Sequence, residues 1–313
     1  MLRLIAKRVL TAIPLLIVVS FVIFWLMQQA GNPAVQLAGN NPSAEDIARV
    51  EKELGFDQPF FIRYFEWLGA AFQGDLGTSY FTGESVTDSI LSRLPVTLSL
   101  VAVALLLAII FGMVLGLLAG LNPGTWIDRA ATIMASVGVA LPYFWVGMML
   151  VLAFSINAPH IPATGYVPFW DNPAQWFMHL LLPGLALAIA PMAVVARQTR
   201  AAVAEVMSQD YIRTATAKGL SKYRVVAKHA LKNAAVPVVT AFGLEASRLI
   251  GGTVVIEQLF VLPGLGRLAY ESVFTRDFPQ VQGVLLFTAI MVLLINLLID
   301  VSYAYFNPRI RQS

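Results

Sequence analysis

Six stretches of the chain are almost wholly apolar over the length that crosses a lipid bilayer. A membrane-spanning helix needs roughly 20 consecutive, predominantly apolar residues. The predicted spans are residues 9–28, 96–121, 131–155, 177–196, 237–259 and 281–304. The pattern therefore predicts an all-α, polytopic transmembrane helical bundle of about six spans. Within the third span, Leu141-Pro142-Tyr143 predicts a kink.

Composition supports a membrane protein and narrows the chemistry. Hydrophobic residues make up 58% of the 313 residues and charged residues 12%, whereas soluble domains contain about 25% charged residues. A soluble globular domain is therefore excluded. The absence of cysteine excludes disulfides, thiolate metal sites and cysteine nucleophiles. His160, His179 and His229 lack the ligand spacing of a zinc site.

The first apolar stretch has two interpretations. Arg3, Lys7 and Arg8 precede it, as basic residues precede the apolar region of a secretory signal peptide. The apolar run is longer than such a region, and no small-residue cleavage site follows it. We therefore expect a retained transmembrane helix rather than a cleaved signal.

The distribution of lysine and arginine predicts the orientation. With a cytoplasmic N-terminus, most basic residues fall in segments on the cytoplasmic side, where transmembrane proteins concentrate them. These are Arg3, Lys7, Arg8, Arg129, the eight basic residues between Arg197 and Lys232, Arg309 and Arg311. Both termini are therefore expected in the cytoplasm.

The segment of residues 29–95 is too long for a bare connection, so we expect it to have its own structure. Ser43 followed by Asp46 has the form of a capping box that opens a short helix, and Gly55 is placed to end that helix. A second predicted helix, Pro59–Phe72, is rich in aromatic residues. It is expected either to lie at the membrane interface or to form an external cap on the bundle, and the two interpretations are compatible.

The segment of residues 197–236 combines positive charge with helix-favouring residues. Gly219 interrupts it once, where a turn between two helices needs a left-handed residue. Ser221 follows as a possible N-cap, and Pro237 marks the entry into the fifth span. The pattern predicts two short helices, joined by a glycine turn, at the cytoplasmic surface.

This segment also carries the most informative motif in the chain. The runs Asp210-Tyr-Ile-Arg-Thr-Ala-Thr-Ala-Lys-Gly219-Leu-Ser and His229-Ala-Leu-Lys-Asn-Ala-Ala-Val-Pro237 resemble the EAA loop of bacterial ABC importer permeases. Arg213, Thr214 and Ala215 stand where the general pattern has Glu-Ala-Ala, so only the last alanine and Gly219 match. The role of that glutamate is therefore not carried over to this chain.

Further motifs make the resemblance specific. They occur in the order and spacing of the first-permease (B-type) subunit of the dipeptide/oligopeptide family, a binding-protein-dependent inner-membrane component. They are Arg8-Val-Leu, Leu54-Gly-Phe-Asp-Gln-Pro59, Gly74-Asp-Leu-Gly77, Leu262-Pro-Gly-Leu-Gly-Arg267, Arg276-Asp-Phe-Pro279 and Asn307-Pro-Arg-Ile-Arg311. The resemblance implies a type I ABC importer-like fold. We divide the chain into residues 1–95, an N-terminal helix with an external helical loop, and residues 96–313, a core permease domain with the coupling loop 197–236.

The family resemblance implies a transport subunit of the bacterial inner membrane that imports peptides or a similar small solute. The chain has no G-x-x-x-x-G-K-[ST] phosphate-binding loop, so it is not expected to hydrolyse ATP itself. The implied partners are a second homologous permease, two cytoplasmic ATPases that hold ATP and Mg²⁺, and an external solute-binding protein. No cofactor of the chain's own and no nucleic-acid partner are expected. Members of the family carry dipeptides, longer peptides, glutathione, nickel complexes or sugars.

In such permeases the coupling loop docks into a groove on an ATPase. The positions expected to couple are Arg213, Ala215, Gly219, Leu220, Arg224 and Leu231. Ala215 and Gly219 are four residues apart, on one helical face, and small enough for close approach. The alternative is that these residues let the loop pack on its own bundle.

Glu245 and Arg248 lie three residues apart inside the fifth span. Uncompensated charges at this depth are costly, so the two are expected to pair or to face a wet interior. They are candidates, with Asn296, for the substrate pathway; a structural ion pair and a structural hydrogen bond are the alternatives. Two other functions are alternatives: a secondary transporter, which predicts inverted repeats, and an intramembrane enzyme, which needs paired catalytic groups. Neither signature is evident in the chain.

Overall fold

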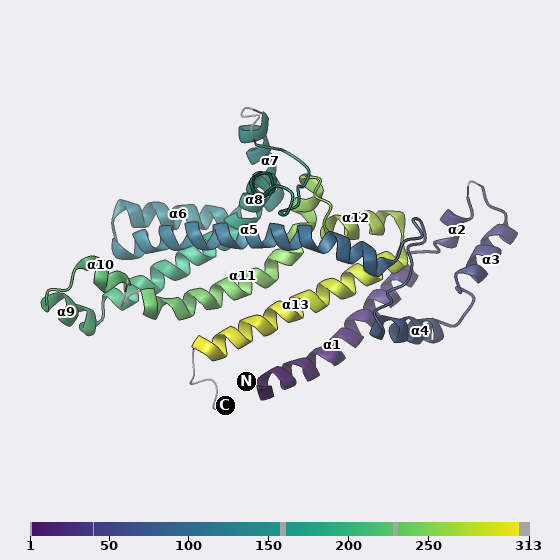
Figure 1. Cartoon of the computed structure of the whole chain (residues 1–313), viewed down its shortest axis with the longest axis horizontal. Helices are drawn as coiled ribbons and strands as arrows, with labels where there is room; N and C mark the ends of the chain where they lie inside the picture. Colours follow the sequence, from purple (N-terminus) through teal and green to yellow (C-terminus); the bar gives the residue numbers. More distant parts are fainter. Residues whose placement is uncertain (1, 40, 157–160, 228–230, 307–313) are drawn as a thin grey trace. The chain divides into compact units, whose positions relative to one another are not determined.

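The computed structural model describes residues 2–39, 41–156, 161–227 and 231–306. Over these residues the chain is helical and has no strand beyond an isolated bridge between Thr78 and Ser85 (Figure 1). The helices are α1 (Leu2–Gln29), α2 (Ala34–Leu37), α3 (Ala44–Glu53), α4 (Phe60–Phe72), α5 (Val86–Leu121), α6 (Trp126–Ala140), α7 (Tyr143–Leu150), the π-helical η1 (Val151–Ile156), α8 (Pro173–Met207), α9 (Asp210–Ala217), α10 (Lys222–Val225), α11 (Leu231–Leu259), α12 (Leu265–Thr275) and α13 (Phe278–Phe306). The predicted all-α fold is confirmed.

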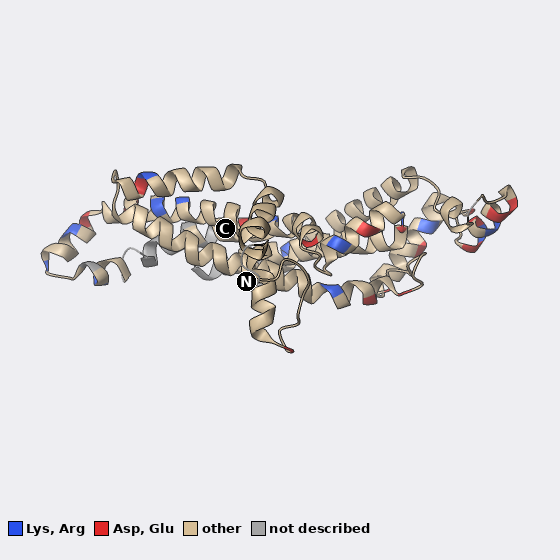
Figure 2. Ribbon diagram, turned by 90° about the horizontal axis from the view of Figure 1, so that it is seen from above, with Lys and Arg blue, Asp and Glu red and all other residues tan. Residues whose placement is uncertain are grey.

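Each predicted span falls on one helix, except the third, which is divided between α6 and α7. Among the described residues, α1, α5, α8 and α13 are long and apolar enough to cross a membrane, and the α6–α7 pair would be a fifth crossing. Figure 2 shows long stretches of helix without a charged residue. The helix that corresponds to the fifth predicted span, α11, carries Glu245, Arg248 and Glu257, which lower its apolar character.

One span prediction needs correction. The third span is not one helix: α6 and α7 meet at an angle of 107°, because Pro142 starts a new helix and Leu141 has an extended backbone. The helix that contains the fourth predicted span, α8, continues past residue 196 to Met207. Its last turns bury Ala202 and Val203 beside Leu117 and Leu121, which keeps the helix intact.

The chain forms two compact units. The core unit comprises residues 96–262 and 294–306, and the N-terminal unit comprises residues 2–95 and 263–293. The division predicted between residues 95 and 96 stays a prediction. The side chains of Lys228, His229, His160, Arg309 and Arg311 lie outside the described residues.

Within the core unit, α8 packs against α6, α7 and α11. The centre of this packing is a cluster of buried leucine, valine and alanine side chains, including Leu100, Leu187 and Ile256. Phe260 and Val146 extend the cluster towards α7. The core therefore surrounds α8, which is the most deeply buried of the apolar helices.

In the N-terminal unit, α4 holds the C-terminal part of α1. Tyr64 is buried, its hydroxyl lies 3.0 Å from the Ser20 hydroxyl, and it donates to the Ile17 carbonyl at 3.1 Å. Phe21 and Phe24 pack edge-on against its ring, and Phe60 packs edge-on against both of them. The rest of α1 leaves most of its apolar side chains exposed. The predicted capping box at Ser43 is confirmed, with both of its hydrogen bonds to Asp46.

Candidate functional site: the coupling loop and the polar residues of the core unit

The predicted glycine turn lies between α9 and α10. Gly219 has φ +81°, in the left-handed region that favours glycine. The Leu220 N–H donates to the Ala215 carbonyl and the Gly219 N–H to the Thr216 carbonyl. This pair of bonds is a Schellman motif, which satisfies the last carbonyls of a helix. The turn is therefore stabilised by the chain's own backbone.

The candidate coupling residues fall into two groups. Ala215 is buried with Ile212 and Val225, and Leu220 packs against them. These side chains face the interior of the loop segment, as the packing alternative expects. Arg213, Gly219 and Arg224 are exposed. Leu231 begins α11, and its side chain lies outside the described residues.

Tyr223 is an exposed aromatic residue of this loop that the sequence did not single out. Tyr223 leaves 83% of its surface exposed at the start of α10. Exposed aromatic and arginine side chains are enriched at protein interfaces. The signal for it was the Ser221 N-cap pattern, which places Tyr223 in the first helical turn. Tyr223 joins Arg213, Gly219 and Arg224 on the outer surface of the loop.

Glu245 and Arg248 pair as predicted. Arg248 Nη1 donates to Glu245 Oε1 at 2.8 Å. Glu245 is buried, at 5% exposure, whereas 70% of the Arg248 side chain is exposed. The two residues also line a cavity of about 300 Å³ between α8 and α11, together with Val194, Arg197, Gln198, Ala241 and Leu244. The pair is thus both an ion pair and part of a cavity wall.

Arg197 and Gln198 belong to this cavity because α8 extends beyond the predicted end of its span. From its sequence position Arg197 is expected in the surface loop, whereas it lies in α8. The cavity therefore holds two guanidinium groups and one carboxylate, so it presents both signs of charge.

Asn296 forms a hydrogen bond of the kind that its structural alternative expects. Its side-chain oxygen accepts a hydrogen bond from the Ser247 hydroxyl at 2.7 Å, which joins α13 to α11. Gly243, on the same face of α11, lies against Ile299. Asn296 is not among the residues that line the α8–α11 cavity.

Asp128 is a buried acid that sequence reasoning did not single out. Its carboxylate accepts two hydrogen bonds from the Arg200 guanidinium, one of them from Nη2 at 2.8 Å, and one from the Gly124 N–H at 2.9 Å. The arrangement ties the start of α6 to α8. The partners are 72 residues apart in the chain, so no local pattern indicated the pair.

Glu257 is fully buried in α11 and accepts a hydrogen bond from the Thr97 hydroxyl of α5 at 2.7 Å. Replacing Thr97 with valine is expected to lower the free energy of unfolding by about 1–2 kcal/mol, because a buried acceptor that loses its donor costs ~1–3 kcal/mol. Denaturation of the purified chain in detergent measures this change in the free energy of unfolding. Thr97→Ser keeps the hydroxyl and is the control. Equal stability of the two variants would show that the bond contributes nothing.

Comparison with known families decides the identity. The N-terminal model of the binding-protein-dependent transport system membrane components matches residues 1–101, and the model of the binding-protein-dependent transport system inner membrane component matches residues 108–312. The chain belongs to this permease family. The predicted family and the predicted function, a permease subunit of an ABC importer, are thereby confirmed.

Individual relatives match the permease over its full length. A Brucella abortus protein named as a peptide transport system permease is 43% identical over 312 residues, covering 99% of both chains. The Escherichia coli glutathione transport system permease GsiC is 41% identical over 312 residues, again covering 99% of both. The solved structure of an amino acid ABC transporter superposes with a TM-score of 0.52 at 19% identity, covering 70% of this chain and 94% of that one. This last likeness shows the fold. The permease is a multi-pass inner-membrane transport subunit.

Proposed function

We propose that this permease carries short peptides into the cell as one subunit of an ATP-driven complex. The observation that supports it most is the match over 99% of the chain to permeases named for peptide and glutathione transport. Glutathione is itself a short peptide. The charges around the α8–α11 cavity suit a zwitterionic solute, since Glu245 can attract an amine and the Arg197 and Arg248 guanidinium groups a carboxylate.

The proposed assembly contains a second homologous permease, two cytoplasmic ATPases that bind ATP and Mg²⁺, and an external binding protein. The basic segment around α9 and α10 supports an orientation with both termini in the cytoplasm. In that orientation the loop meets the ATPases through its exposed residues Arg213, Gly219 and Arg224. Ala215 and Leu220 support that surface from within the loop.

A reconstitution experiment tests this function. The tagged permease is purified from its native membranes with its bound partners and inserted into vesicles. We expect ATP hydrolysis by the complex and uptake of a labelled dipeptide that depends on ATP. The permease produced alone is the control and should do neither. Uptake driven by an ion gradient without ATP would instead indicate a secondary transporter.

Replacing Glu245 with glutamine is expected to reduce dipeptide uptake about tenfold, the effect of losing ~1.4 kcal/mol of interaction with the solute. Membrane abundance should be unchanged, because glutamine keeps the shape and can still accept a bond from Arg248. Uptake and immunoblotting of the same membranes measure both. The exposed residue Glu84 supplies the control Glu84→Gln. If abundance falls in step with uptake, Glu245 is a structural residue.

A further inference from the structure

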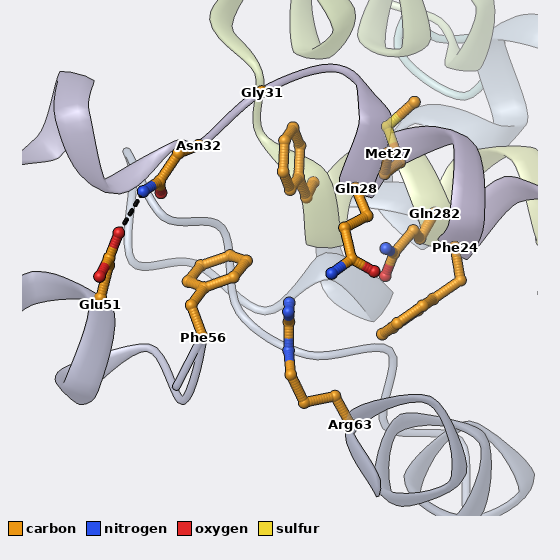
Figure 3. A pocket seen from close by; sticks show the side chains of 10 residues that line it. Phe24, Met27, Gln28, Gly31, Asn32, Glu51, Phe56, Arg63 and Gln282 are labelled. Atoms are coloured by element: carbon orange, nitrogen blue, oxygen red, sulfur yellow. Dashed lines mark hydrogen bonds between the residues drawn. The ribbon is translucent and has the colours of Figure 1, made fainter. Parts of the chain in front are cut away.

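The N-terminal unit contains a second cavity that the proposed transport pathway does not use. Its volume is about 370 Å³, within the usual range of small-molecule sites. Figure 3 shows Arg63, Gln28 and Gln282 turned towards one another at this cavity. The aromatic rings of Phe24, Phe56 and Phe278 form other parts of its wall.

Arg63 is the central feature of the cavity. Its guanidinium group is half-buried, and it forms neither an ion pair nor a hydrogen bond with any residue that the structure describes. Desolvation lowers the pKa of Arg63, so the surroundings disfavour the charge. Arginine nevertheless stays protonated in proteins. An anion entering the cavity would offset this cost, since a partly desolvated charge gains from a partner of opposite sign.

The aromatic rings hold the guanidinium in place. Its central carbon lies 4.1 Å from the centre of the Phe56 ring and 5.8 Å from that of Phe24, within the range of cation–π contact. The stacked group keeps its N–H edge available for a planar carboxylate, which arginine binds through two parallel hydrogen bonds. The Arg63 guanidinium is therefore preorganised for binding an anion.

The other polar side chains of the cavity determine which kind of anion can bind beside Arg63. Glu51 lines the same cavity and accepts a hydrogen bond from the Asn32 side chain. Its negative charge disfavours a multiply charged anion such as phosphate and favours a ligand that also carries an amine. Gln28 and Gln282 offer amide groups that form no hydrogen bond with described residues. Such amides match the peptide bond of a ligand.

We propose that this cavity binds a short peptide through its free carboxylate, with Arg63 as the carboxylate-binding residue. The choice of a peptide rests on the proposed transport function. The site itself rests on the unpaired guanidinium, the rings that hold it and the adjoining amides. It would be a binding site separate from the α8–α11 cavity.

Calorimetric titration of the purified full-length permease with glycylglycine tests the site. We expect wild type to bind glycylglycine and to bind glycylglycinamide, which lacks the carboxylate, about 10- to 100-fold more weakly, the effect expected from losing a bond between charged groups. Acetate should bind more weakly than the dipeptide. Equal affinity for the acid and the amide, or for acetate and the dipeptide, would overturn the proposal.

Substitutions assign the effect to one residue. Arg63→Gln is expected to lose the same 10- to 100-fold of glycylglycine affinity, and Arg63→Lys, which keeps the charge but not the planar fork, should lose less. Arg49→Gln is the matched control, because Arg49 is an exposed arginine of the same unit that pairs with Asp46. Unchanged affinity in Arg63→Gln contradicts the assignment. If the Arg63→Gln variant does not fold, the proposal is tested by comparing the affinities of the wild-type permease for glycylglycine and glycylglycinamide.

The binding measurement separates this site from the proposed function. It needs neither ATP nor partner subunits. A reconstituted complex that imports dipeptides, but whose permease binds glycylglycine and its amide equally, would overturn the Arg63 site and leave the transport function intact. If the permease binds glycylglycine in a carboxylate-dependent way but the reconstituted complex does not take it up, the Arg63 site is supported and the transport function is overturned.

Discussion

Replacing Gly116 with alanine is expected to destabilise the permease by roughly 3 kcal/mol, the upper end of the usual cost of overpacking. A Cβ atom at Gly116 would lie 2.4 Å from the Ala196 carbonyl oxygen and 2.6 Å from Thr199 Cβ. Gly112 and Gly120, one helical turn away on either side, face α8 at similarly short distances. The three glycines allow α5 and α8 to approach closely, as small residues do between membrane helices. The Ala196 carbonyl belongs to the backbone, and a Cβ atom such as that of Thr199 does not move when its side chain rotates, so a side-chain rotation cannot make room.

Gly251→Ala is the matched control for this substitution. Gly251 also lies inside a helix, α11, but a Cβ there meets nothing within 4 Å. Alanine at this position should be neutral or stabilise by up to about 1 kcal/mol through its helix propensity. Thermal unfolding of the two purified variants in detergent compares them. If Gly116→Ala unfolds at the wild-type temperature, α5 and α8 do not pack this closely.

Replacing Gly219 with valine is expected to reduce peptide-stimulated ATP hydrolysis of the assembled complex about tenfold, because a β-branched residue in the left-handed region costs ~1–3 kcal/mol. Gly219 has φ +81°, and a Cβ there meets no atom within 4 Å. The effect would therefore come from the backbone turn and not from a clash. A distorted turn changes the angle between α9 and α10, which the proposed contact with the ATPase requires.

Gly219→Asn separates the turn from the bulk of a side chain. Asparagine adopts the left-handed conformation far more readily than valine, so this variant should retain most of its coupled hydrolysis. Membrane abundance of both variants is measured alongside ATPase activity. Unchanged coupling in Gly219→Val would end the proposal that this turn transmits movement to an ATPase.

Local signals in the sequence were sufficient for the parts of the fold that are locally determined. The Ser43 capping box, the glycine turn at Gly219 and the long apolar helices each depend on residues close in the chain. The sharp break at Pro142 was predicted as a kink, but its angle depends on how α7 packs against α8 and α11. The continuation of α8 was missed because its charged surface resembles a loop while its other face is buried.

The candidate site was predictable only in part for a related reason. Glu245 and Arg248 were found because they are three residues apart on one helix. The pairing of Asp128 with Arg200, and the place of Arg197 beside Glu245, depend on helices that meet only in the folded chain. Arg63 gave no signal at all, since an arginine in an aromatic helix is unremarkable until its lack of a partner is seen.

The exposed surface of α1 has a consequence for how this helix tolerates change. The α1 side chains before Ser20, such as Leu10 and Val18, are largely exposed. Helix α4 packs against the C-terminal part of α1, around Phe24. Shape complementarity therefore constrains the first half of α1 very weakly within this chain. Substituting one apolar residue for another in the first half of α1 should change stability little, whereas substitutions in the half that contacts Tyr64 should be poorly tolerated.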